Sequence, residues 1–131
     1  FWPGEETGSE AASKVLRLLK ENYVDIHAWH FVRYLAPRRF YRLLHQCCCL
    51  VGNSSVGVRE AGAIGTPVVN IGTRQTGRVS AANVITVGHD LQHIRAAVVK
   101  QQGQRYPQST LYGTGHAGEK VAQWISEILA A

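Results

Sequence analysis

The chain has 131 residues, of which 45% are hydrophobic and 18% are charged, and its formal net charge at pH 7 is +5. This is the composition of one soluble globular domain. It excludes a disordered chain, and it excludes a membrane protein because the longest apolar runs fall far short of the ~20 residues that cross a bilayer.

The first part of the chain predicts two helices with a strand between them. Ser9 is expected to cap a helix whose apolar stripe spans residues 10–19. Residues 26–32 form an apolar and aromatic run of strand length. Pro37 begins the second helix, since proline suits the first turn. The expected inner face of that helix consists of Phe40, Leu43 and Leu44.

The remainder of the chain alternates strands with helices. Strands are expected at residues 47–51, 68–71 and 83–87, and helices between Ser55 and Gly65, from Asp90 to Lys100 and from about His116 to Leu129. Apolar strands that alternate with helices indicate a parallel sheet with crossover connections. The sequence therefore predicts part of a doubly wound, Rossmann-like α/β domain. The chain contains no methionine, which predicts that it is a fragment of a longer protein.

Three cysteines follow one another at Cys47, Cys48 and Cys49. Their number does not suit a disulfide framework, and neither their spacing nor that of the six histidines suits a zinc site. We interpret them as small apolar residues of a buried strand, with free thiols that fit a reducing cytoplasm. A catalytic cysteine is the alternative. We expect no metal and no cofactor.

Basic residues are densest at Arg33, Arg38, Arg39 and Arg42. Nucleic-acid binding is one interpretation, but no helix-turn-helix, zinc-finger or aromatic-sheet signature accompanies the cluster. We favour a solvated basic face that suits phosphorylated small molecules.

The segment from Gly52 to Glu60 has the features of an anion site. Ligands of parallel α/β sheets collect where strands end and helices begin. The helix expected to start at Ser54 and Ser55 has backbone N–H groups without internal partners, which attract an anion. Glu60 lies about one and a half turns further on, where a carboxylate can accept hydrogen bonds from ribose hydroxyls. The alternative is a simple serine cap and a solvated glutamate.

Two further motifs bear on this site. Arg74 follows the strand at residues 68–71, where a guanidinium suits a diphosphate or a sugar, although a surface arginine is the alternative. Residues 113–118 match G-x-G-x-x-G, but a dinucleotide site would need a preceding strand and a complete βαβ unit after it. We therefore reject a dinucleotide site there.

The run at residues 52–78, GNSSVGVREAGAIGTPVVNIGTRQTGR, closely resembles the hydrolysing UDP-N-acetylglucosamine 2-epimerases. The similarity extends to Phe1-Trp2-Pro3, Gly8-Ser9, Asn83-Val84, Tyr106-Pro107 and Tyr112-Gly113. It implies a glycosyltransferase-B fold. Residues 1–131 would form part of its second, nucleotide-binding domain, without the first strand, the first helix and most of the second strand. It also implies an N-terminal domain on the same chain and a homo-oligomeric full-length enzyme.

The resemblance implies a UDP site that consists of Ser54, Ser55, Glu60, Arg74, Leu35 and Gly4. The two serines would bind the diphosphate, Glu60 the ribose and the Leu35 backbone the uracil. Gly4 replaces an asparagine that is usual in the family, which removes a polar contact near the nucleotide. The family's catalytic groups lie before Phe1, so no catalytic residue is expected in this chain, and the chain alone should be inactive.

The expected reaction of the parent protein converts UDP-N-acetylglucosamine and water to N-acetylmannosamine and UDP, for the synthesis of sialic acid or a related sugar. Two alternatives stay open from the sequence. One is a glycosyltransferase of the same fold, and the other is a non-enzymatic basic module that binds nucleic acid.

Overall fold

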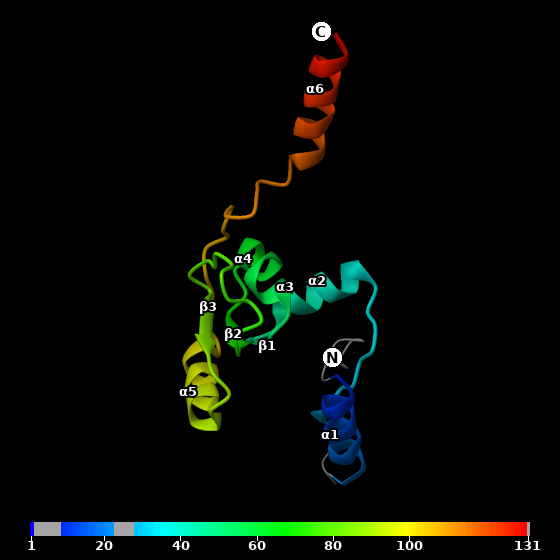
Figure 1. Ribbon diagram of the computed structural model, residues 1–131. Helices are drawn as coiled ribbons and strands as arrows, with labels where there is room; N and C mark the ends of the chain where they lie inside the picture. Colours follow the sequence, from blue (N-terminus) through cyan, green and yellow to red (C-terminus); the bar gives the residue numbers. More distant parts are fainter. Residues whose placement is uncertain (2–8, 23–27, 131) are drawn as a thin grey trace. The chain divides into compact units, whose positions relative to one another are not determined.

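The computed structural model describes residues 1, 9–22 and 28–130, which divide into two compact units, Phe1–Phe40 and Tyr41–Ala131 (Figure 1). The helices are α1 (Ser9–Asn22), α2 (Pro37–Gln46), α3 (Ser55–Val58), α4 (Glu60–Ile64), α5 (Leu91–Gln101) and α6 (Ala117–Ala130). The strands are β1 (Leu50–Gly52), β2 (Val68–Ile71) and β3 (Val84–Val87).

The first unit contains α1 and the start of α2. The predicted apolar stripe does form a helix, and Ser9 is its first residue rather than the cap before it, a one-residue difference that is common at helix ends. Two pairs of aromatic rings are in contact among the described residues beyond α1 or at its flank. The Phe1 ring meets the Phe40 ring edge to face at 5.4 Å, and Trp29 stacks on Phe31 at 6.3 Å.

The strand predicted at residues 26–32 is wrong for the part that can be described. Residues 28–32 have no strand conformation, while residues 26 and 27 lie outside the described part of the chain. A strand needs a neighbour to satisfy its backbone groups, and the described sheet contains only β1, β2 and β3. The aromatic run therefore reflects ring contacts, and Trp29 is 57% exposed.

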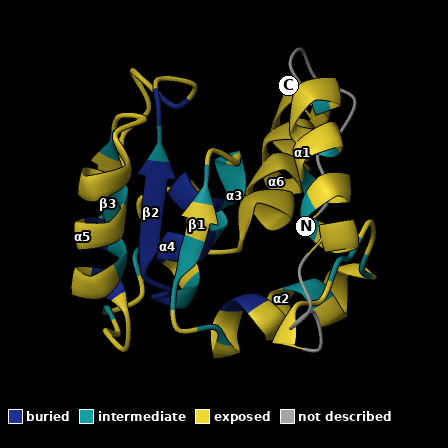
Figure 2. Cartoon of the chain, turned by 90° about the horizontal axis from the view of Figure 1, so that it is seen from below, coloured by how far each residue is buried: buried dark blue, intermediate teal, exposed yellow. Residues whose placement is uncertain are grey.

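The second unit is built on a parallel sheet with the order β1-β2-β3, in which Leu50 pairs with Val68 and Val68 with Val84. Neighbouring residues of a strand point to opposite faces. Val68 and Val69 are 2% and 0% exposed, so both faces of β2 are covered (Figure 2). Helix α3 contacts β1 and β2, and α5 contacts β2 and β3. This confirms the predicted Rossmann-like α/β class.

The strand predicted at residues 47–51 begins only at Leu50, whose N–H donates to the Pro67 carbonyl at 2.8 Å. Cys47–Cys49 precede the strand, and Cys48 is exposed, so the interpretation of the cysteines as a buried strand is wrong. The reason lies in the neighbouring strand. β2 starts after Pro67, which has no N–H to donate, and the cysteines therefore find no partner strand.

The single helix predicted between Ser55 and Gly65 is divided into α3 and α4 at Arg59. The Arg59 N–H still donates to the Ser55 carbonyl at 2.9 Å, so the chain continues in helical fashion through the break. Small residues bring this segment close to β2. A Cβ atom added to Gly57 would lie 2.9 Å from Cγ1 of Val68.

Helix α6 forms where the terminal helix was predicted, and none of its residues is buried. In the described residues, no helix combines the length and the apolar character that a membrane span requires.

The Gln101 side chain, which is 0% exposed, joins α5 to the sheet. Its Nε2 donates to the carbonyls of Val68 and Asn83 at 2.9 and 2.8 Å, and its Oε1 accepts the Tyr106 hydroxyl at 2.7 Å. One buried amide thus makes three hydrogen bonds, although the Asn83 carbonyl also accepts the Val68 N–H at 2.8 Å.

Replacing Gln101 by leucine is expected to lower the free energy of unfolding by roughly 2–4 kcal/mol, because buried polar groups lose their partners. Urea unfolding measures the change. The matched control is Gln102→Leu at the next, exposed position, which should stay within about 0.5 kcal/mol of the wild type. Superimposable curves for Gln101→Leu and the wild type would contradict the role given to this amide.

Candidate functional site

Two loops leave the sheet at the same edge. β1 and β2 are parallel, and Gly52 at the end of β1 pairs with Asn70 near the end of β2. The loop that carries Ser54 follows β1, and the loop that carries Arg74 follows β2. The structure therefore brings the predicted serines and arginine to the carboxyl edge of the sheet, where ligands of such sheets bind.

Ser54 is the N-cap of α3, with extended backbone, and its Oγ accepts the Val56 N–H at 3.4 Å. The capping role that the sequence left open is thus present. The cap leaves the hydroxyl group able to make a further hydrogen bond, because a serine that accepts through its oxygen can still donate its own O–H. Ser55 is the first helical residue and is half-buried.

Glu60 begins α4 and is half-buried. Its Oε2 atom is buried and has no hydrogen-bond partner among the residues that the structure describes. Leaving a buried carboxylate oxygen without a donor is costly, so such an atom is a place where a ligand hydroxyl would bond. This environment does not fit the alternative of a fully solvated Glu60.

The loop after β2 consists of successive tight turns. The Thr76 N–H donates to the Thr73 carbonyl at 2.9 Å, and the Arg78 N–H donates to the Gln75 carbonyl at 3.1 Å. Gly72, at φ +79°, packs so close to the His89 ring that an added Cβ atom would lie 2.9 Å from it. Arg74 is exposed in this loop.

Sequence reasoning missed Gln75. Its Nε2 donates to the Asn53 carbonyl at 2.7 Å and so fastens the loop after β2 to the loop after β1. The available signal was its place next to Arg74, within the run at residues 52–78 that resembles the epimerases.

The structure does not test two of the predicted site residues. Leu35 is half-buried in the unit Phe1–Phe40, whereas the loops described above belong to the other unit. Gly4 lies outside the described residues. Their roles in a UDP site stay predictions.

A second set of contacts joins later segments to the same unit. The Tyr112 hydroxyl donates to the Val79 carbonyl at 2.5 Å, and the Arg59 guanidinium lies 5.9 Å from the centre of the Tyr112 ring. The glycine-rich residues 113–118 follow Tyr112 and lead into α6 without a strand before them. This arrangement lacks the strand that a dinucleotide-binding glycine loop requires.

The cysteines and acidic residues offer little for catalysis or metal binding. Burial raises the pKa of the Cys47 and Cys49 thiols, which lowers the fraction of reactive thiolate at neutral pH. Within the described ranges, no group of three or more histidine, cysteine, aspartate or glutamate side chains could hold a metal ion.

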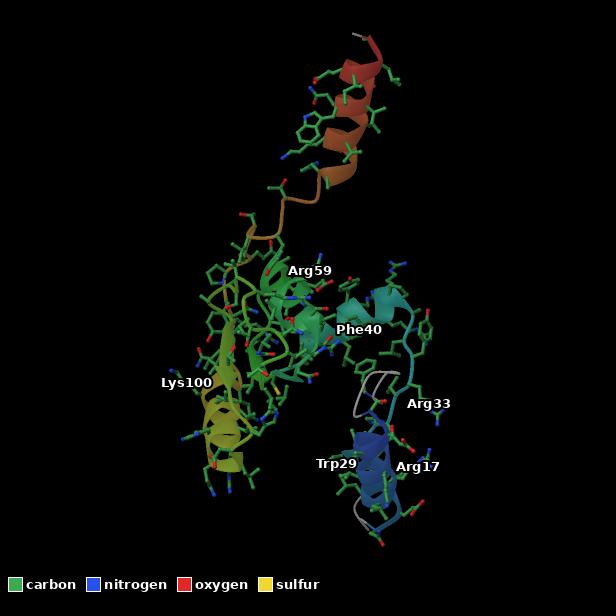
Figure 3. The ribbon with its side chains drawn as sticks, in the orientation of Figure 1. Arg17, Trp29, Arg33, Phe40, Arg59 and Lys100 are labelled. Carbon is green, nitrogen blue, oxygen red and sulfur yellow. The ribbon has the colours of Figure 1, made fainter. Side chains whose placement is uncertain are left out.

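The basic side chains are spread over different elements. Arg17 extends from α1, Arg59 from the junction of α3 and α4, and Lys100 from α5 (Figure 3). In the cluster noted in the sequence, the arginines of α2 are all exposed. Exposed arginines on this helix are what the solvated basic face that we favoured requires, and that face stays a prediction.

Comparison with known proteins identifies the family to which this sheet edge belongs. The model of the family described as UDP-N-acetylglucosamine 2-epimerase matches residues 6–126. The chain belongs to this family. The match contains both loops of the sheet edge, together with Glu60 and Gln75.

Two relatives in this family are similar to most of the chain. The UDP-N,N'-diacetylbacillosamine 2-epimerase (hydrolyzing) of Legionella pneumophila is 30% identical over 127 residues, which are 94% of this chain and 33% of the relative. The UDP-N-acetylglucosamine 2-epimerase of Neisseria meningitidis serogroup B is 29% identical over 99 residues, which are 75% of this chain and 25% of the relative. The chain thus spans a quarter to a third of the length of these epimerases.

Proposed function

We propose that the chain is the UDP-binding part of a hydrolysing UDP-N-acetylglucosamine 2-epimerase, which converts UDP-N-acetylglucosamine and water to N-acetylmannosamine and UDP. Family membership and the name of the Legionella relative, which specifies a hydrolysing enzyme, support this proposal. The observation that carries it is the buried Oε2 of Glu60, which has no hydrogen-bond partner among the described residues, near the edge of the sheet from which the loops of Ser54 and Arg74 leave.

In this proposal the chain binds UDP, which is the leaving group of the reaction. Ser54, Ser55 and Arg74 bind the diphosphate, and Glu60 accepts hydrogen bonds from the ribose hydroxyls. Donors aimed at the β-phosphate stabilise the negative charge that develops there as the bond to the sugar breaks. Binding of this kind speeds departure of UDP without a catalytic acid or base in these residues.

We further propose that residues 1–131 are part of the second domain of a glycosyltransferase-B fold, with the groups that move the C2 proton elsewhere in the protein. The share of the relatives' length that the chain covers supports this division. We therefore expect residues 1–131 alone to be inactive. The three free thiols fit a cytoplasmic enzyme.

The proposal is tested by incubating the complete protein with UDP-N-acetylglucosamine and no acceptor. We expect N-acetylmannosamine and UDP in equal amounts, detected by chromatography and mass spectrometry. Residues 1–131 alone serve as the matched control and should release neither product. Turnover that requires an added sugar acceptor would instead identify a glycosyltransferase and contradict the proposal.

A further inference from the structure

The amide of Gln75 makes a hydrogen bond that joins the two loops at the proposed UDP site. The side chain is 6% exposed, and its Nε2 donates to the main-chain carbonyl of Asn53 at 2.7 Å. The two residues are 22 positions apart, so the bond is tertiary and not part of a local turn.

Each of the two bonded residues is next to a predicted diphosphate-binding residue. Asn53 directly precedes Ser54, the cap of α3, and Gln75 directly follows Arg74. A donor at Gln75 and an acceptor at Asn53 therefore fix the distance between the serine turn and the arginine turn. A diphosphate that contacts both turns needs that distance to be set before it binds.

The other end of the same amide is unusual. Oε1 of Gln75 is buried and has no partner among the described residues. The amide is therefore held through its nitrogen alone, and its oxygen is an acceptor without a described donor beside the two loops. A residue that only filled the core would not need a polar side chain.

Thr66 provides a comparison at the opposite edge of the sheet, before β2 begins. Its Oγ1 donates to the main-chain carbonyl of Leu44 at 2.8 Å, in a buried bond that also joins residues 22 positions apart. The two bonds are alike in length and in type of acceptor, and they differ in their distance from the proposed site. Loss of either bond should lower stability, whereas only the Gln75 bond should matter for the ligand.

We infer that Gln75 is a positioning residue, which holds the Ser54–Ser55 turn and the Arg74 turn in the geometry that receives the diphosphate of UDP. This inference rests on the proposed function for its ligand. It extends that function by making diphosphate binding depend on a residue that need not touch the ligand.

The test uses Gln75→Met in the complete protein, with Thr66→Val as the matched control. Methionine keeps the length of the side chain and removes the donor, so the loops lose their connection. We expect UDP affinity, measured by calorimetry, to fall roughly fivefold to tenfold while uridine affinity stays unchanged. Thr66→Val should leave both affinities unchanged, although it is destabilised.

A second measurement does not depend on the ligand. Amide hydrogen exchange at residues 54–57 should accelerate in Gln75→Met without UDP, because the turn before α3 loosens, and it should not accelerate in Thr66→Val. Gln75→Leu, which also removes the donor and adds no charge next to the proposed diphosphate site, should behave like Gln75→Met. It serves as the second variant if methionine packs poorly.

The outcomes separate the inference from the proposed function. A wild-type protein that does not bind UDP would overturn the proposed function, while the exchange rates at residues 54–57 would still decide whether Gln75 holds the loop. Unchanged exchange and UDP affinity in both Gln75 variants would overturn the inference. Equal loss of UDP and uridine affinity, or the same loss in Thr66→Val, would also overturn it by indicating a general effect on stability.

Discussion

Replacing Glu60 by glutamine is expected to weaken UDP binding by about ten- to a hundredfold. Glutamine keeps the shape of the side chain and removes the negative charge, so ribose hydroxyls lose charge-assisted hydrogen bonds worth roughly 1.5–3 kcal/mol. The buried Oε2 atom has no hydrogen-bond partner in the part of the chain that the structure describes, and in the bound state the ligand would supply its donors. Calorimetry with UDP and the complete protein measures the change.

The matched control for this prediction is Glu119→Gln on α6. Glu119 is an exposed glutamate whose Oε2 lies 3.0 Å from Nδ1 of His116, and we expect its substitution to leave UDP affinity unchanged. If Glu60→Gln binds UDP like the wild type, then Glu60 is a structural residue of α4 and the proposed ribose contact is wrong.

Replacing Gly65 by alanine is expected to lower the free energy of unfolding by about 2–5 kcal/mol, through two separate costs. Gly65 adopts φ +82° at the C-cap of α4, a conformation that L side chains rarely adopt. An added Cβ atom would also collide with the main-chain carbonyl oxygen of Tyr106, a residue held in place because its N–H donates to the Gly65 carbonyl at 3.1 Å. Chemical denaturation measures the loss.

Gly77→Ala separates these two costs. Gly77 has the same φ of +82° as Gly65, but an added Cβ atom there would meet nothing within 4 Å. This variant should lose only the conformational part, about 1–2 kcal/mol. Equal losses at Gly65 and Gly77 would show that the segment around Tyr106 moves aside freely, contrary to the close packing described here.

The sequence was sufficient for the class of fold, because the alternation of apolar strands with helices is a local pattern. Residues 68–71 carry apolar side chains on both faces, with Asn70 as the one polar residue among them, and they form the central strand with both faces covered. Asp90 stands where a helix was expected to begin, and it caps α5 by accepting the His93 N–H at 2.9 Å. Such features depend on neighbouring residues, and the sequence displays them directly.

The same local patterns gave wrong strand predictions where a strand needs a neighbouring strand to pair with. The aromatic run at residues 28–32 has the composition of a strand, but whether it becomes one depends on a neighbouring strand that composition does not reveal. The strand predicted at Cys47–Cys49 does not form for the same reason, because β2 begins after Pro67, too late to pair with these residues. In both cases the backbone hydrogen bonds of a distant segment decided the outcome.

The sequence by itself determined the fold class, the positions of most helices and the segment at residues 52–78 in which the candidate site lies. Only the tertiary structure decided that one oxygen of Glu60 is buried without a partner among the described residues and that Gln75 connects two loops across 22 residues. Burial and long-range hydrogen bonds arise from the packing of segments that are far apart in the chain. Spacing along the sequence identifies residues of suitable chemistry, and the folded sheet determines which of them meet.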